Sequence, residues 1–193
     1  IGRMVKDSKS DTLGSLFAAQ WLGFGLLGNR IRLDPIDNPW CTDSLMQSMR
    51  DESALFFVSL VRDNRPIEDL INAPYTFMNE ELSREIYGMD SVRGAKMRQV
   101  PLNDPRRAGI LTHGSLMAIT SNYKETSPIK RGNWILETLL GKPLPPPPPN
   151  AGAFSEVLEN DDSLTFQEKV ELHSKRASCK SCHSKIDPLG FSL

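Results

Sequence analysis

The chain has 193 residues, of which 39% are hydrophobic and 24% are charged, as in an ordinary globular protein. This length allows one large domain or two small ones. Lys and Arg total 23 and Asp and Glu total 24, and the net charge of -1 gives no electrostatic reason to expect nucleic acid or an anionic membrane as a partner. We therefore expect no nucleic-acid binding.

The chain contains no apolar stretch of the roughly 18 to 20 residues that a membrane-spanning helix needs. The longest candidate, residues 16–27, is short and is interrupted by Gln20, Gly23 and Gly25. We expect no transmembrane segment here. The chain begins with Ile1 and shows no signal peptide, so we expect a fragment of a longer protein whose signal lies upstream.

Hydrophobic spacing predicts three helices in the first half of the chain, at residues 11–28, 42–62 and 78–87. Intervals of three and four residues place apolar side chains on one face of each helix. For the first helix the predicted face consists of Leu13, Leu16, Phe17, Trp21, Phe24 and Leu27, and for the second helix it includes Leu45, Met49, Phe56 and Leu60. Gly28 and Gly88 are typical helix ends.

The periodicity fades between residues 90 and 107, which indicates a domain boundary or a small β excursion. Farther on, Ser127 followed by Pro128 predicts a helix start, and Thr165 with Glu168 matches a capping box. Between these helices, residues 143–149 are proline except for Leu144. Such a run must be extended; it could bind a proline-recognising domain, but we favour a stiff connector.

The motif with the clearest chemistry is Cys179-Lys180-Ser181-Cys182-His183, the C-x-x-C-H pattern of c-type haem attachment. Helical positions three and four apart share a face, so both thiols can reach the vinyl groups at one edge of a porphyrin while the imidazole reaches the iron. We therefore expect one covalent haem c, with His183 as the proximal iron ligand. A backbone carbonyl near a turn at Pro188 could accept the other imidazole proton.

Other interpretations of the motif stay open. Cys179, Cys182 and His183 could supply three of four zinc ligands, or the two thiols could form a redox disulfide. The distal haem ligand is also open: Met117 or His113 is the first candidate and His173 is a further one, unless the position is empty or filled from beyond the chain. The basic residues Arg106, Arg107, Lys130 and Arg131 could pair with haem propionates, although solvated surface is favoured. Cys41 is read as a small buried or interface residue.

Seven segments carry a resemblance to a known family: QWLG at 20–23, MRDE at 49–52, FF at 56–57, YTFMNE at 75–80, DPRRAGILTHGS at 104–115, TSPIKRG at 126–132 and CKSCHSKIDPLGF at 179–191. With these segments and the polyproline run, the chain resembles the large planctomycete-type multidomain cytochromes, which contain consecutive domains of unknown function around a C-x-x-C-H haem site. The resemblance implies a periplasmic or otherwise extracytoplasmic protein with further domains on both sides.

Together these features predict a mainly α fold. We expect a helical domain of unknown function at residues 1–103 and a small helical haem-c-binding domain at residues 104–193, connected by loops and the polyproline segment. The expected function is electron transfer to redox partner proteins or to other domains of the full-length chain. The alternatives are a haem-dependent enzyme domain, either peroxidase-like or feeding electrons to a catalytic domain, and a zinc-binding interaction module.

Overall fold

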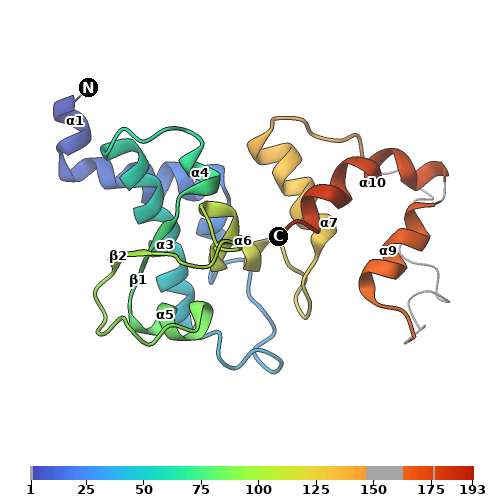
Figure 1. Cartoon of the computed structure of the whole chain (residues 1–193), viewed down its shortest axis with the longest axis horizontal. Coiled ribbons are helices and arrows are strands. Elements are labelled where there is room, and N and C mark those ends of the chain that lie inside the picture. The colour runs from blue at the N-terminus through green and yellow to red at the C-terminus, as the bar shows by residue number, and fades with distance from the viewer. Residues whose placement is uncertain (1, 147–162, 176) are drawn as a thin grey trace. The chain divides into compact units, whose positions relative to one another are not determined.

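The computed structural model describes residues 2–146, 163–175 and 177–193. The chain forms two compact units, residues 1–126 (unit 1) and 127–193 (unit 2) (Figure 1). Helices dominate, which confirms the predicted mainly α fold. The predicted boundary between residues 103 and 104 lies within unit 1 and stays a prediction about sequence domains. The polyproline connector lies outside the described residues from position 147 onward.

Unit 1 is built around one long amphipathic helix, α3 (Asp43–Arg62), as predicted. The Thr42 hydroxyl caps its first turn by accepting a hydrogen bond from the Leu45 N–H at 3.1 Å. Leu45, Met49 and Phe56 are almost fully buried along one stripe of α3. Each such side chain contributes about 1.5 to 3 kcal/mol through burial, so this stripe holds unit 1 together.

The first predicted helix, residues 11–28, is wrong in its continuity and partly wrong in its face. After α1 (Gly2–Lys6) and η1 (Ser8–Asp11), the chain forms a π-helical segment η2 (Leu13–Ala18), α2 (Ala19–Trp21) and η3 (Phe24–Leu26). Gly23 breaks the run with a left-handed backbone, φ 81°. Gly14 lies so close to α3 that a Cβ there would be 2.2 Å from the Ala54 carbonyl oxygen. The segment therefore docks through small residues, and Phe17 stays 55% exposed.

The β excursion expected between residues 90 and 107 is real but short. Strand β1 (Tyr75–Met78) pairs antiparallel with β2 (Arg98–Pro101), with Tyr75 opposite Pro101 and Met78 opposite Arg98. Between them lies α5 (Glu80–Tyr87), which ends at Gly88 with φ 62°, as predicted from the glycine. The strands place Thr76 against α3, where its side chain is fully buried.

Three short helices complete unit 1. They are α4 (Asp69–Asn72), η4 (Ile110–Thr112) and α6 (Gly114–Ile119). Gly109 precedes η4 with φ 56°, and a Cβ there would lie 2.4 Å from the Ile71 carbonyl carbon. This close approach of η4 to α4 leads the chain into α6, which packs on α3 and brings His113 into the core.

Unit 2 contains α7 (Pro128–Trp134), the π-helical segment η5 (Ile135–Leu139), α9 (Phe166–Ser174) and α10 (Ala177–Gly190). The predicted Ser127 cap with Pro128 in the first turn is confirmed, and so is the capping box of Thr165 and Glu168. Helices α7 and α10 cross closely: a Cβ on Gly132 would lie 2.2 Å from the Ile186 carbonyl oxygen. The absence of a side chain at Gly132 therefore allows α7 and α10 to approach this closely.

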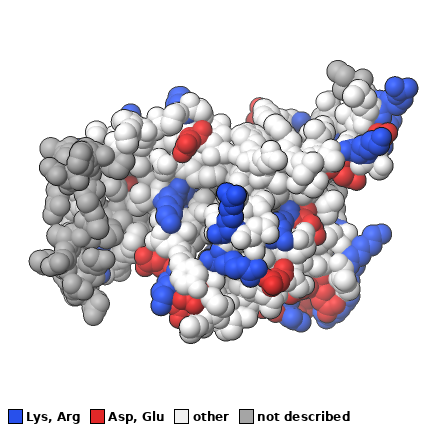
Figure 2. All heavy atoms as spheres, turned by 180° about the vertical axis from the view of Figure 1, so that it is seen from behind, with Lys and Arg blue, Asp and Glu red and all other residues white. Residues whose placement is uncertain are grey.

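Two further observations concern the surface and the membrane. Basic and acidic side chains lie interspersed over the face shown in Figure 2, in line with the near-zero net charge. No helix in the described part of the chain combines the length and the apolar character that crossing a bilayer requires.

Candidate functional site

The C-x-x-C-H motif lies on α10, which gives its residues the helical spacing that the sequence predicted. Cys179 is 5% exposed, and Cys182 and His183 are half-buried. Farther along the same stripe, Ile186 is buried and Gly190 packs against α7. The two thiols and the imidazole are therefore presented on the inner side of α10 rather than on its solvent face.

His183 has one ring nitrogen engaged. Its Nδ1 lies 2.9 Å from the Asp187 Oδ1, one helical turn farther on. A carboxylate only accepts hydrogen bonds, so Nδ1 is the donor, and in the neutral ring the lone pair lies on Nε2. This tautomer is the one in which a histidine ligates a metal through Nε2 while a second group orients the ring.

The partner of Nδ1 differs from the one expected from the sequence. The sequence indicates a turn around Pro188, where a backbone carbonyl could accept the His183 proton. Instead Pro188 lies inside α10, and the helix continues to Gly190. Proline lacks an N–H, so the bond back to Ser184 is lost, but the helical turn still places the Asp187 carboxylate below the imidazole.

The chemistry of the donor set is compatible with a covalent haem, because two thiols and an imidazole lie on one helix at the spacing that thioether attachment requires. No disulfide joins any of the three cysteines, so both motif thiols keep their sulfur chemistry. Within residues 2–146, 163–175 and 177–193, no three His, Cys, Asp or Glu side chains converge in a way that could hold a metal ion. A zinc site needs such convergence, whereas thioether bonds to two vinyl groups need sulfurs spread along a porphyrin edge.

A second histidine faces His183 from the neighbouring helix. The ring of His173, on α9, lies edge-on to that of His183, with centroids 5.2 Å apart and planes at 66°. His173 is 8% exposed, and it shares the buried side of α9 with Val170. The two helices thus bring two imidazoles together at the motif.

Arg131 departs from the expectation that the basic residues are surface groups. It is 4% exposed on α7, and its Nη1 donates to the Leu193 carbonyl at 3.3 Å. Burial lowers the pKa of its guanidinium. By contrast, Arg106 is exposed and pairs with Asp104 at 2.9 Å, as the surface interpretation predicts.

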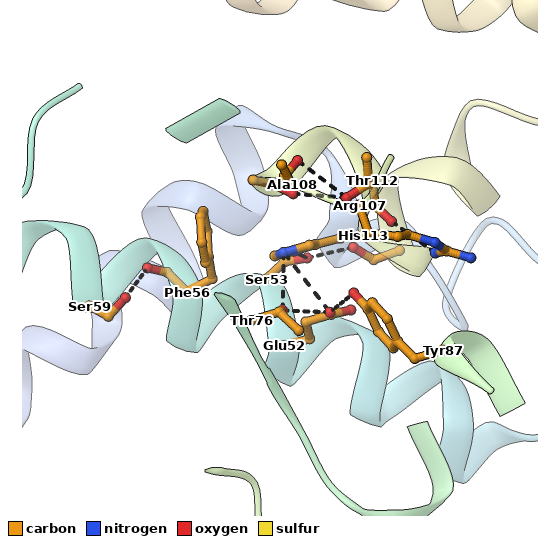
Figure 3. A network of polar contacts seen from close by, with 12 residues as sticks. Glu52, Ser53, Phe56, Ser59, Thr76, Tyr87, Arg107, Ala108, Thr112 and His113 are labelled. Carbon is orange, nitrogen blue, oxygen red and sulfur yellow. Dashed lines mark hydrogen bonds and ion pairs between the residues drawn. The ribbon is translucent and has the colours of Figure 1, made fainter. Parts of the chain in front are cut away.

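Unit 1 holds a separate cluster of polar groups, shown in Figure 3, which we call the Glu52 network. It contains Glu52 and Ser53 of α3, Thr76 of β1, Tyr87 of α5, and His113 and Ser115 next to and on α6. Glu52, Ser53, Thr76, His113 and Ser115 are all fully buried. Glu52 Oε1 accepts hydrogen bonds from the Thr76 hydroxyl at 2.7 Å and from the Tyr87 hydroxyl.

Counting protons in the Glu52 network determines the tautomer of His113. Thr76 uses its only hydroxyl proton on Glu52, so at 3.2 Å it must accept from His113 Nε2. His113 Nδ1 is then a lone pair and accepts from the Ser53 hydroxyl at 3.0 Å. Ser53 in turn accepts from Ser115 at 2.7 Å. Both ring nitrogens of His113 are therefore used inside the core.

The pKa values in the network follow from its burial. Desolvation raises the pKa of Glu52 from 4.5 to about 7, although hydrogen bonds from Tyr87 and Thr76 act in the opposite direction. Desolvation lowers the pKa of His113 from 6.5 to about 3, so this ring is neutral at physiological pH. Its Nε2 lies 3.9 Å from Glu52 Oε1, but a neutral ring makes no ion pair there.

These positions bear on the two first candidates for the distal haem ligand. His113 and Met117 belong to unit 1, where His113 precedes α6 and half-buried Met117 lies on it. Binding iron through His113 would break a hydrogen bond in a fully buried network, which costs about 1 to 3 kcal/mol per group left unsatisfied. The structure therefore disfavours His113, while Met117 stays a prediction.

Sequence reasoning missed the Glu52 network, although one signal was present. Glu52 falls on the apolar stripe of α3, between Met49 and Phe56, at three- and four-residue spacing. A carboxylate at a core position of an amphipathic helix needs buried partners. Those partners come from β1, α5 and α6, and no local pattern could identify them.

In comparison with known proteins, two parts of the chain match families of domains of unknown function, and both families are typical of planctomycete-type multidomain cytochrome-like proteins. In particular, residues 107–193 match the family PSCyt3, a protein of unknown function (DUF1588). Residues 1–89 match the family PSD4, a protein of unknown function (DUF1592). No curated protein and no solved structure matches the chain. The motif on α10 lies in the PSCyt3 match, whereas unit 1 combines the PSD4 match with the first residues of PSCyt3.

Proposed function

We propose that this chain is a c-type cytochrome module that binds one covalent haem and transfers single electrons. Cys179 and Cys182 supply the thioether sulfurs, and His183 supplies an iron ligand. The observation that carries the proposal is the contact of His183 with Asp187: its Nδ1 donates to the carboxylate, so in the neutral ring Nε2 has the lone pair that a metal needs.

Each residue has a distinct task in this proposal. The thioether bonds from Cys179 and Cys182 would prevent the haem from dissociating. The module could therefore retain its haem even at a site that is partly open to solvent. Asp187 orients the imidazole and would make it a stronger electron donor to the iron, which favours the ferric state. The bound haem supplies one-electron chemistry between ferrous and ferric iron, and no general acid or base is required.

The setting follows from the same chemistry. Haem is attached to reduced cysteines by maturation machinery outside the cytoplasm, so we propose a periplasmic or otherwise extracytoplasmic location. We propose that electrons pass to redox partner proteins or to other domains of a longer chain. The matches to two domain families in one chain support this multidomain setting.

The test is expression of the 193-residue chain together with a c-type haem maturation system, followed by intact mass and absorption spectra after denaturation. The expected result is one haem per chain that stays bound in denaturant. The double variant Cys179→Ser/Cys182→Ser should lose it completely. Cys41→Ser is the matched control, because this half-buried cysteine lies outside the motif, and it should keep full haem content.

Two results would contradict the proposal. One is a colourless protein of unmodified mass after maturation in a strain that loads a known cytochrome. The other is stoichiometric zinc that disappears in the same double variant, which would support the zinc module instead.

A further inference from the structure

We propose that His173 is the second axial ligand of the haem iron, opposite His183, so that the module carries a six-coordinate bis-histidine haem. This inference rests on the proposed function, because it needs a haem at the motif. It deepens that function by assigning the sixth position to a residue of unit 2.

The first support is the placement of His173 on α9. The capping box of Thr165 and Glu168 defines where the helix begins. From this start, only Val170 and His173 are buried among the described side chains of α9, whereas Leu172 is 39% exposed. One of the two buried positions of α9 is therefore taken by an imidazole. An apolar residue would be the ordinary choice for packing alone.

The second support is distance. The centroids of the His173 and His183 rings are 5.2 Å apart. Metal–imidazole bonds of about 2 Å on both sides of one iron separate the ring centres by about 6 Å. The rings thus need to move apart by about 1 Å and to turn from their edge-on contact so that both nitrogens point at the iron. Side-chain rotation supplies changes of this size.

The third support is the supply of ligands in unit 2. His173 and His183 are the only histidines after residue 126, and all seven methionines precede residue 118. His113 is committed at both nitrogens to Ser53 and Thr76 in unit 1. Within residues 127–193, His173 is therefore the one histidine or methionine besides His183 that could complete the iron coordination.

The assignment has a functional consequence. With both axial positions filled by imidazole, the iron has no open site for peroxide or another small oxidant. The module is then suited to electron transfer, and the peroxidase-like alternative requires an open position that the wild-type haem would not offer.

The experiment uses the haem-loaded 193-residue chain and separates two questions. Mass after denaturation reports whether haem is attached, and the electron paramagnetic resonance and absorption spectra of the native ferric protein report its ligands. We expect a low-spin bis-histidine spectrum for the wild type. His173→Ala should keep the haem mass but lose the low-spin signal, and added imidazole should restore it.

Two more variants make the result specific. His173→Met should give the sulfur-to-iron charge-transfer band of histidine–methionine ligation, which a purely structural role of His173 would not produce. Leu172→Ala, at the neighbouring exposed position, should leave the spectrum unchanged. A haem-loaded His173→Ala protein that keeps the wild-type low-spin spectrum overturns this inference but leaves the proposed function intact. Absence of haem from the wild type overturns both.

Discussion

His113 in unit 1 and His183 in unit 2 are both buried or half-buried histidines beside a carboxylate, yet their chemistry differs. His113 has hydrogen-bond partners at both ring nitrogens and a fully enclosed ring. His183 has a carboxylate at Nδ1, with its side chain 15% exposed. The comparison shows that the second ring nitrogen decides what a buried histidine can do. With both nitrogens bonded the residue is structural, and with one lone pair available it can bind a metal.

The carboxylates differ in the same way. Glu52 is fully buried, and desolvation raises its pKa to about 7. Asp187 is 22% exposed and sits one turn from the imidazole it orients. A buried carboxylate mainly couples the fold to pH, whereas a half-exposed one can tune a neighbouring ligand.

The largest effect on stability should come from the variant His113→Ala. Deleting a fully buried ring leaves a cavity and unpairs Ser53 and Thr76, so the free energy of unfolding of unit 1 should fall by about 3 to 5 kcal/mol. His183→Ala in the haem-free chain should cost less than about 1 kcal/mol. Urea denaturation followed by fluorescence measures both values, and equal losses would contradict the distinction between the two histidines.

The Glu52 network should make stability depend on pH. The folded-state pKa of Glu52 is raised from 4.5 to about 7, so its stabilising contribution is full below pH 4.5 and is lost as the pH rises through 7. At about 1.4 kcal/mol per pKa unit, the stability of the wild type relative to Glu52→Gln should fall by about 3 kcal/mol between pH 4 and pH 8.

His113 makes the stability of the fold change with pH in the opposite direction. Its pKa is lowered from 6.5 to about 3, so its contribution is present above pH 6.5 and is lost as the pH falls toward 3. Between pH 4.5 and 6.5 the effects of Glu52 and His113 on stability offset each other. The variant Glu52→Gln should therefore reveal the rise of stability with pH that His113 contributes. As a control, Asp104→Asn should change the profile only below about pH 4, because hydrogen bonds from Arg106 lower the pKa of that carboxyl to about 2. A parallel profile for wild type and Glu52→Gln would show that Glu52 stays ionised.

Gly132→Ala tests the close crossing of α7 with α10, the helix that carries the C-x-x-C-H motif. Its Cβ would meet the Ile186 carbonyl oxygen at 2.2 Å, so α7 and α10 must move apart. We expect a loss of about 2 kcal/mol in the stability of unit 2, measured by denaturant unfolding. Gly2→Ala, where a Cβ meets nothing within 4 Å, is the control and should be neutral. An unchanged Gly132→Ala protein would mean that the helices do not cross as closely as described.

Asp187→Asn should have the smallest effect on folding and a specific effect on redox chemistry. The pair is partly exposed, so its loss should change stability by less than about 1 kcal/mol. In the haem-loaded chain the reduction potential should rise, because a neutral amide makes His183 less electron-donating. Potentiometric titration of wild type and variant measures this shift. A reduction potential that is unchanged or lower in the variant would argue against Asp187 as the hydrogen-bond partner of His183.

Much of the local structure was predictable from residue spacing and capping. The stripe and cap of α3, the stop at Gly88, the start at Ser127 and Pro128 and the capping box of α9 all depend on residues within a few positions of each other. The helical spacing of the C-x-x-C-H motif is of the same kind. In contrast, the segment at residues 11–28 was mispredicted because its docking depends on contact between Gly14 and α3, not on its own apolar periodicity.

The sequence by itself determined the mainly helical fold and the face shared by Cys179, Cys182 and His183, because helical geometry relates positions three and four apart. Only the tertiary structure decided which histidine keeps a free lone pair and which carboxylate is buried. Those properties depend on partners that are far away in sequence: the Ser53 hydroxyl that occupies His113 is 60 residues from it. Spacing along one helix carries no information about such a partner.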